Sequence, residues 1–357
     1  MAIKELWRGR RFYTSPYPLL GARSAGTALV PVDLLKQIQE DTIDTLSIHL
    51  IGNVVVAGTL AGAGAPNGNY NPQSLVTLTT LTTAPQASGL IPLNAISPRI
   101  AVLDQAVLNG SFASFAQIPD TPGTFPLDAW VHFGFKRPLA RKGIEFAHPL
   151  RKWKTDVLNV VFGTRDQLFT GGTNTWDLTA VTVEFFADMD VAAAPDNIHA
   201  VELFELDFNI VATNSSFIIN QLPAGTYYDN LYIVTEDPAF GGLTDAMLVN
   251  IDVEGAGRFW LPQGENNAAW VRNEFTKPAF WDQTQDLTGI YILPLRDGMW
   301  SRALDAVAQP IVLRLNVNSL STTSLVRLGG RKIVPGGIKK TIKGPDGKKT
   351  VVGLPDA

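Results

Sequence analysis

Short segments rich in β-branched and aromatic residues recur along most of this chain and limit the folds open to it. Examples are residues 128–135 (DAWVHFGF), 155–163 (TDVLNVVFG) and 178–190 (LTAVTVEFFADMD). Gly, Pro, Asn or Asp bounds these segments, as expected where strands give way to turns. Turn signals return about every 8–15 residues, which is typical of sandwiches and barrels rather than of alternating strands and helices. We therefore predict an all-β fold.

A length of 357 residues calls for more than one hydrophobic core. About 14–16 predicted strands match two eight-stranded sandwiches in tandem. We place the first sandwich over residues 33–190 and the second over 198–320, joined by a linker at 191–197 (VAAAPDN). Short helices interrupt them, and one is predicted to begin at Ser97 and Pro98. Residues 1–32 and 321–357 are predicted to be extended terminal arms.

The two halves of the chain resemble each other weakly but in the same order. In each half a strand leads to a Pro-Leu pair, at Pro138-Leu139 and at Pro294-Leu295, then to an irregular stretch and a further strand. The repeat period of about 160–185 residues is too long for a solenoid and indicates a duplicated domain.

This arrangement resembles the double-jelly-roll major capsid proteins of the lineage that includes tectiviruses, corticoviruses and adenovirus hexon. Residues 221–225 (QLPAG) and 289–295 (GIYILPL) look like segments of tectivirus coat proteins. The resemblance implies that each sandwich is a jelly roll. It also implies homotrimeric capsomers of pseudo-hexagonal outline, which tile an icosahedral shell, usually over an internal membrane.

The same resemblance implies the partners and location of the chain. The partners would be other copies of itself, minor capsid and vertex proteins, and an internal viral membrane contacted by the terminal arms. The chain would reside in the capsid of the virion, after assembly in the host cytoplasm, with a bacteriophage as the expected virus. No sequence-specific binding of nucleic acid is expected.

Charge is distributed unevenly, because the two ends are basic whereas the body between them is acidic, for a net charge of −4. A third basic cluster lies at 136–154. Basic segments of this kind suit an anionic surface or an acidic neighbouring subunit, although many such segments are simply solvated. The candidate subunit or membrane contacts are Lys4, Arg8, Arg10, Arg11, Lys136, Arg137, Arg141, Lys142, Arg151, Lys152, Lys154, Arg331, Lys332, Lys339 and Lys340.

Tryptophan is abundant, with eight residues in the chain. Aromatic side chains dominate both cores and interfaces, so half or more are expected to be core. Trp270, in the polar stretch GENNAAWVRNEF, and Trp281 are the candidate interface aromatics.

Signatures of catalysis are missing from the sequence. It has no cysteine, and its four histidines, His49, His132, His148 and His199, lack metal-ligand spacing. Glu205 and Asp207 would share one face of a strand, as a glycosidase pair or a calcium site would require, but a solvent-facing row is the commoner explanation. We expect no enzyme activity, cofactor or metal. The alternatives are a carbohydrate-active β-sandwich protein, either lectin or glycosidase, and a phage receptor-binding spike.

Overall fold

The fold is taken from a computed structural model of the chain. The structure describes residues 8–12, 17–18, 27–28, 32–33, 42–57, 69–70, 76–83, 93–96, 98–109, 118–119, 122–135, 155–162, 175–177, 180–190, 200–222, 227–237, 242–255, 258–259, 266–279, 287–294, 304–305, 311–334, 339–343 and 349–353.

One sheet belongs to the first half of the chain. Its centre is the long strand β5 (Thr42–Ala57), which pairs antiparallel with β10 (Gly123–Gly134) on one side and β13 (Val181–Asp190) on the other. Leu46, Val54 and Val56 are buried on one face of β5, whereas on the opposite face Ile51 and Val55 are exposed. Near the start of the strand, Ser47 and His49 on that opposite face are also buried. The remaining strands are β1 (Arg8–Phe12), β2 (Tyr17–Pro18) and β12 (Thr175–Asp177).

A second sheet belongs to the second half. Its strand order is β15 (Asn214–Leu222), β22 (Ile311–Val317), β18 (Leu248–Gly255) and β19 (Arg258–Phe259). Strand β22 alternates perfectly between buried and half-exposed residues, because its odd-numbered residues face the core and its even-numbered residues face outward. Each buried Ile or Leu of this kind stabilises the fold by about 1.5–3 kcal/mol.

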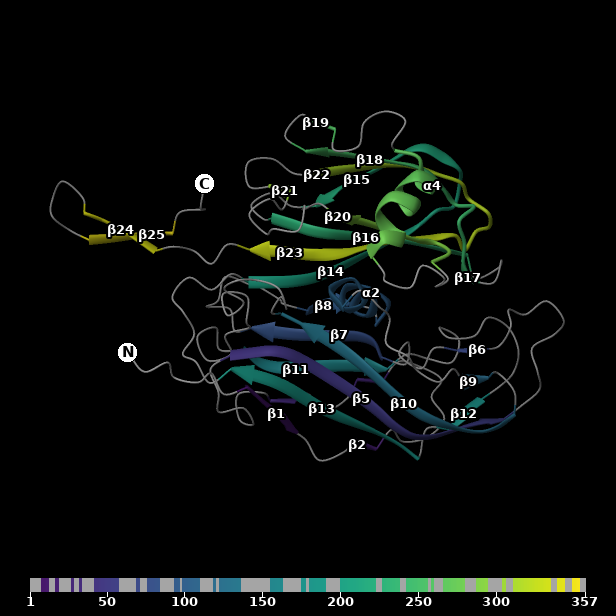
Figure 1. The fold of residues 1–357 in the computed structure, drawn as a ribbon, viewed down its shortest axis with the longest axis vertical. Coiled ribbons are helices and arrows are strands. Elements are labelled where there is room, and N and C mark those ends of the chain that lie inside the picture. Colours follow the sequence, from purple (N-terminus) through teal and green to yellow (C-terminus); the bar gives the residue numbers. More distant parts are fainter. Residues whose placement is uncertain are drawn as a thin grey trace.

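A third sheet of eleven strands runs through both halves of the molecule (Figure 1). Strands β8 and β14 join the halves by parallel pairing, with Leu203 opposite Leu93 and Phe204 opposite Asn94. The strands of the first half are β3 (Thr27–Ala28), β4 (Val32–Asp33), β7 (Val76–Thr83), β8 (Leu93–Ile96) and β11 (Thr155–Phe162). Those of the second half are β14 (Ala200–Asn209), β16 (Tyr227–Asp237), β17 (Gly242–Leu243), β20 (Ile290–Pro294), β21 (Leu304–Asp305) and β23 (Leu325–Val334).

Each half is therefore a sandwich of two sheets, and the all-β double jelly roll expected from the sequence is confirmed. Two strand pairs stand apart from the large sheets: β6 (Asn69–Tyr70) with β9 (Ile118–Pro119), and β24 (Lys339–Lys343) with β25 (Lys349–Gly353). The helical elements are α2 (Pro98–Asn109), as predicted, then α4 (Ala268–Val271), the π-helix η6 (Arg272–Thr276) and the 3₁₀ turn η7 (Lys277–Ala279). None of the described helices is long and apolar enough to cross a membrane.

The predicted end of the second jelly roll at residue 320 is wrong. Strand β23 follows that point and lies between β14 and β16, so it is central to the eleven-stranded sheet. Asp237 holds the turn that leads into it by accepting hydrogen bonds from Ser321 Oγ at 2.8 Å and Ser324 Oγ at 2.6 Å. Its sequence, LVRLGGRKIV, contains three charges and two glycines, which concealed a central strand.

Helix α2 lies between the two jelly rolls (Figure 1). It belongs to the first half of the chain but packs on β23 of the second half. A Cβ placed on Gly329 would lie 2.5 Å from Ile100 Cδ1, so only glycine lets the helix approach so closely. The two halves therefore meet through direct packing at this helix as well as through the shared sheet.

We predict that Gly329→Ala destabilises the protein by about 1–3 kcal/mol, because the added methyl group overpacks the contact with Ile100. Glycine-to-alanine changes at unstrained sites usually stabilise, so the sign of the change is diagnostic. Urea denaturation of Gly329→Ala, Ile100→Val and the double variant would measure it. Purely additive effects in the double variant would contradict direct packing between the two positions.

Candidate assembly surfaces and the junction between the jelly rolls

Arg331 is one of the predicted surface contacts, yet it is fully buried. Its guanidinium forms an ion pair with Asp104 of α2, which is also fully buried, with Nε 3.0 Å from Oδ1. Nη2 donates to Gly134 O at 2.7 Å and Nη1 to Phe135 O at 3.3 Å, both at the end of β10. The prediction that Arg331 contacts a neighbour or membrane is therefore wrong, because its side chain is enclosed within its own subunit.

Tyr232 completes this buried network by donating its hydroxyl to Asp104 Oδ1 at 2.9 Å. Burial, and then the adjacent Asp104 carboxylate, raise the pKa of Tyr232 well above 10. Burial opposes the charge of Arg331, but Asp104 outweighs it and raises the guanidinium pKa. The Arg331 guanidinium therefore stays charged, and its ion pair with Asp104 connects α2 and β10 of the first jelly roll to β16 and β23 of the second.

We predict that Arg331→Met destabilises the protein by about 3–5 kcal/mol, because it leaves the Asp104 carboxylate buried without its cationic partner. The double variant Arg331→Met/Asp104→Leu removes both charges and should recover most of that loss. Chemical denaturation of the single and double variants would measure both effects. If the double variant were no more stable than Arg331→Met, the ion pair would not be the cause.

Lys332, the next predicted contact, is tied to its own sheet. Its Nζ lies 2.9 Å from Glu202 Oε1 and 5.9 Å from the centre of the Phe204 ring. Burial raises the pKa of Glu202, although Lys332 acts in the opposite direction. A half-buried lysine in this position has little freedom to reach another subunit.

The acid pair Glu205 and Asp207 lies on β14, on the same face, as the alternation predicts. Arg327 of β23 binds both, with Nη1 3.3 Å from Glu205 Oε1 and 2.7 Å from Asp207 Oδ2. It also contacts Glu236 of β16, with Nη2 2.9 Å from Oε1. These acids form a cross-strand ionic network, so their grouping has a structural explanation that needs neither a glycosidase nor a calcium site.

The other predicted basic contacts fall into two groups. Arg8, Arg10 and Arg11 lie in β1, where Arg8 is opposite Asp190 and Arg10 is opposite Asp188 of β13, so this part of the expected arm joins its own sheet. Lys339 and Lys340 lie in β24. Outside the described residues are Lys4, Lys136, Arg137, Arg141, Lys142, Arg151, Lys152 and Lys154.

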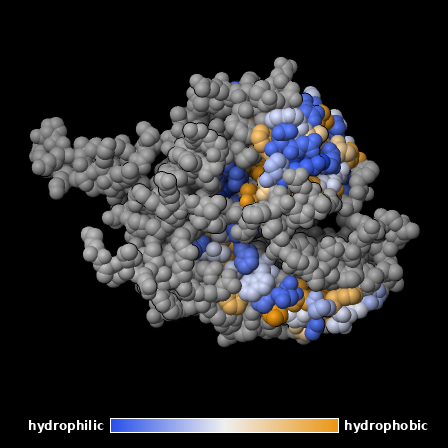
Figure 2. Space-filling model, viewed as in Figure 1, coloured by the Kyte–Doolittle hydropathy of each residue, from blue (hydrophilic) through white to orange (hydrophobic). Residues whose placement is uncertain are grey.

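Of the two candidate interface tryptophans, Trp281 lies outside the described residues and Trp270 lies in α4. Trp270 is half-buried, packs against the core of the second jelly roll and meets Phe275 edge-to-face at 5.3 Å. Much of its surface therefore contributes to the core. The surface over α4 is largely hydrophilic, with apolar side chains at its border (Figure 2).

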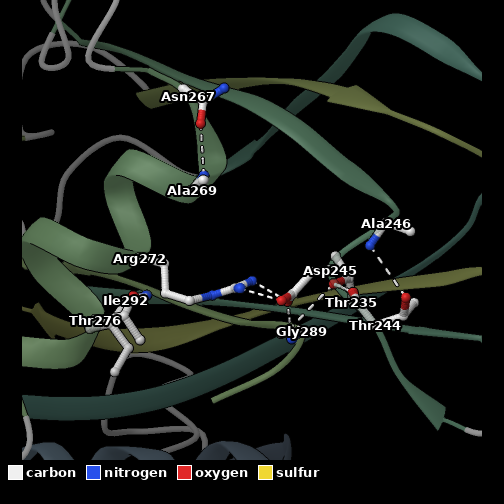
Figure 3. Close-up of polar contacts among 10 residues, drawn as sticks. All are labelled: Thr235, Thr244, Asp245, Ala246, Asn267, Ala269, Arg272, Thr276, Gly289 and Ile292. Atoms are coloured by element: carbon white, nitrogen blue, oxygen red, sulfur yellow. Dashed lines mark hydrogen bonds and ion pairs between the residues drawn. The ribbon is translucent and has the colours of Figure 1, made fainter. Parts of the chain in front are cut away.

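A polar network fixes this helical segment to the second jelly roll (Figure 3). Asn267 caps α4 by accepting from the backbone N of Ala269 at 2.9 Å. From η6, Arg272 forms a bidentate ion pair with Asp245 and lies 4.7 Å above the Tyr291 ring. Thr276 Oγ1 accepts from Ile292 N at 2.9 Å. A π-helix is rare. Here it begins at Arg272, whose side chain is directed at Asp245 and Tyr291.

Gly289 is required at the centre of this network. Its φ of +68° favours glycine, and a Cβ there would lie 2.5 Å from Thr235 O. The Gly289 N–H donates to Asp245 Oδ1 at 2.6 Å, and its carbonyl accepts from Thr235 N at 2.8 Å. The Asp245 carboxylate, in the turn before β18, thus joins that turn to the turn before β20 and to the helical segment.

We predict a loss of stability as pH rises from about 10 to 12. Burial raises the pKa of Tyr291 from 10.0 to about 12, so between these values the unfolded chain loses a proton that the folded chain retains. Urea midpoints at pH 9, 10 and 11 would measure the slope. Tyr291→Phe should reduce the slope, and an unchanged slope in this variant would contradict the role of Tyr291.

Two of the four histidines, His49 and His132, lie among the described residues, and each contacts a polar side chain of its own sheet. His49 Nε2 lies 2.9 Å from Asp128 Oδ1, and His132 Nδ1 lies 2.7 Å from Ser47 Oγ. Both imidazoles stack on Trp130. Among the described residues, no group of three or more His, Asp or Glu could hold a metal ion.

Comparison with known proteins gives no match to a protein-family model and none to a curated protein sequence. Solved structures match over nearly the full lengths of both chains. The STIV MCP, a Sulfolobus turreted icosahedral virus protein, is 15% identical with a TM-score of 0.64, covering 92% of this chain and 97% of its own.

Two further capsid structures match in the same way. The major capsid protein P2 of bacteriophage PM2 is 12% identical with a TM-score of 0.51, covering 92% of this chain and 98% of its own. A chain of the PBCV-1 virus capsid is 10% identical with a TM-score of 0.53, covering 94% and 96%. At these identities the likeness is one of fold. The chain therefore has the double-jelly-roll fold of these viral capsid proteins.

Proposed function

We propose that this chain is the major capsid protein of an icosahedral virus. The observation that carries the proposal is the match in fold over more than nine-tenths of both this chain and the STIV and PM2 capsid proteins. A match of such extent includes both jelly rolls and their junction, whereas a shared single sandwich would be common to many unrelated functions.

The physical character of the molecule supports a structural role. A shell subunit has to keep its shape while its edges bind neighbours, and here a shared sheet, helix α2 and a buried ion pair fix the two jelly rolls to each other. The clustered acids on β14 are occupied by Arg327. These features support a structural role in preference to the carbohydrate-active alternative.

In this proposal three copies form a capsomer of pseudo-hexagonal outline, in which six jelly rolls approximate six-fold symmetry. Capsomers then tile the shell, together with minor capsid and vertex proteins. The basic segment at 136–154 and the terminal segments contact acidic neighbours or an internal membrane. The site of action is the virion of a bacteriophage, after assembly in the host cytoplasm. A receptor-binding spike would instead occur in few copies per particle.

We expect the purified chain to have a native mass near three times 38.7 kDa. Native mass spectrometry, with negative-stain imaging of the same sample, would measure the mass and the outline. Trimers of pseudo-hexagonal outline, or curved and closed assemblies of them, are the expected result. A chain that stays monomeric at high concentration, or that binds glycans as a monomer, would contradict the proposal.

A further inference from the structure

Strand β15 lies at the edge of its sheet among the described strands. Among the described strands it pairs only with β22, and that pairing is interrupted twice by register shifts. Its sequence, NSSFIINQL, has no charge and no proline. Natural sheets protect exposed edges with charged residues, proline, β-bulges or a covering segment, and β15 has neither a charge nor a proline. Here Ile218, on the strand, is 47% exposed.

Strands β24 and β25 present the complementary problem. Within the described part of the chain they pair only with each other, and Figure 1 shows them standing away from both jelly rolls. A two-stranded hairpin is marginally stable alone in water. Directly opposed like charges weaken it further, and the register places Lys343 opposite Lys349. Among the described strands, the hairpin therefore has no third strand to stabilise it.

We propose that the hairpin of one copy adds to the sheet of a second copy, with β25 pairing along the side of β15 that faces away from β22. This inference rests on the proposed assembly of many copies into a shell. Strand β25 is the better partner because Thr350, Val351 and Val352 favour extended structure. Its five residues span about 17 Å, which the nine residues of β15 can accommodate.

One row of residues crosses the outer face of the receiving sheet. Arg314 of β22 lies opposite both Ile218 of β15 and Asp252 of β18, so these residues form one row across the sheet. Glu254 of β18 lies 3.6 Å from Arg314, while Asp252 accepts from Asn266. Both carboxylates thus have partners within the sheet, on the far side of β22 from the added strand. Backbone pairing along β15, rather than charge, provides the proposed contact.

The absence of cysteine allows a direct test between copies. One chain carries Ser216→Cys in β15, another carries Thr350→Cys in β25, and the two are co-assembled and treated with a short bismaleimide. Each chain has one cysteine, so a Ser216–Thr350 heterodimer arises only between copies. We expect at least about tenfold more heterodimer than in a control with Ala269→Cys, at an exposed position of α4, in place of Thr350→Cys.

A second measurement keeps the proposal testable if the cysteine variants assemble poorly. Chains truncated after residue 335 should still form trimers but should give shells that dissociate at lower urea concentration. Trimers and shells of unchanged stability, or assembled shells without the heterodimer, would overturn the hairpin proposal and leave the capsid function standing. Hairpin-dependent binding to phosphatidylglycerol vesicles without the heterodimer would assign the hairpin to lipid instead. Failure of the full chain to form any assembly would overturn the capsid function itself.

Discussion

The buried ion pair between Arg331 and Asp104 fixes how the two halves of this molecule sit together. Each half has its own core, and two sandwiches joined only by a connecting segment would be free to move relative to each other. Arg331 removes that freedom because its donors are directed at three groups of the first jelly roll: the Asp104 carboxylate, Gly134 O and Phe135 O. Two buried charges contribute little net stability but impose a specific geometry, since any other arrangement leaves them unpaired.

The same rigidity suits the proposed role in a shell. Contacts between capsomers add up over many copies, so an error in the angle between jelly rolls would be repeated at every contact. The continuous sheet through β8 and β14 and the close approach of α2 at Gly329 hold this angle together with the ion pair. In the second jelly roll, Asp245 plays a comparable local part by fixing the helical segment through Arg272 and Gly289.

Strand patterning in the sequence was sufficient to predict the all-β class, the duplication and helix α2, because each depends on local periodicity. It was not sufficient to place β23. Charged residues at 327, 331 and 332 resemble a solvated tail, and nothing local shows that carboxylates on β14, β16 and α2 receive them. The exposure of Trp270 was also difficult to predict. Its polar sequence neighbours suggested an exposed side chain, whereas Phe275 and the core enclose much of it.

The sequence by itself determined which segments extend, where they turn and that two sandwiches share one chain, since alternation and turn residues act over a few neighbouring positions. Only the tertiary structure decided which basic residues are buried and which of the described strands lie at the edge of a sheet. Pairing between Arg331 and Asp104 spans 227 positions of the chain. The place of β15 at the edge of its sheet, among the described strands, depends on its pairing with the distant strand β22. Both features depend on contacts between residues that are far apart in the chain. For Arg331, burial is tolerated because the fold brings a carboxylate to it, which offsets the cost of removing the charge from water.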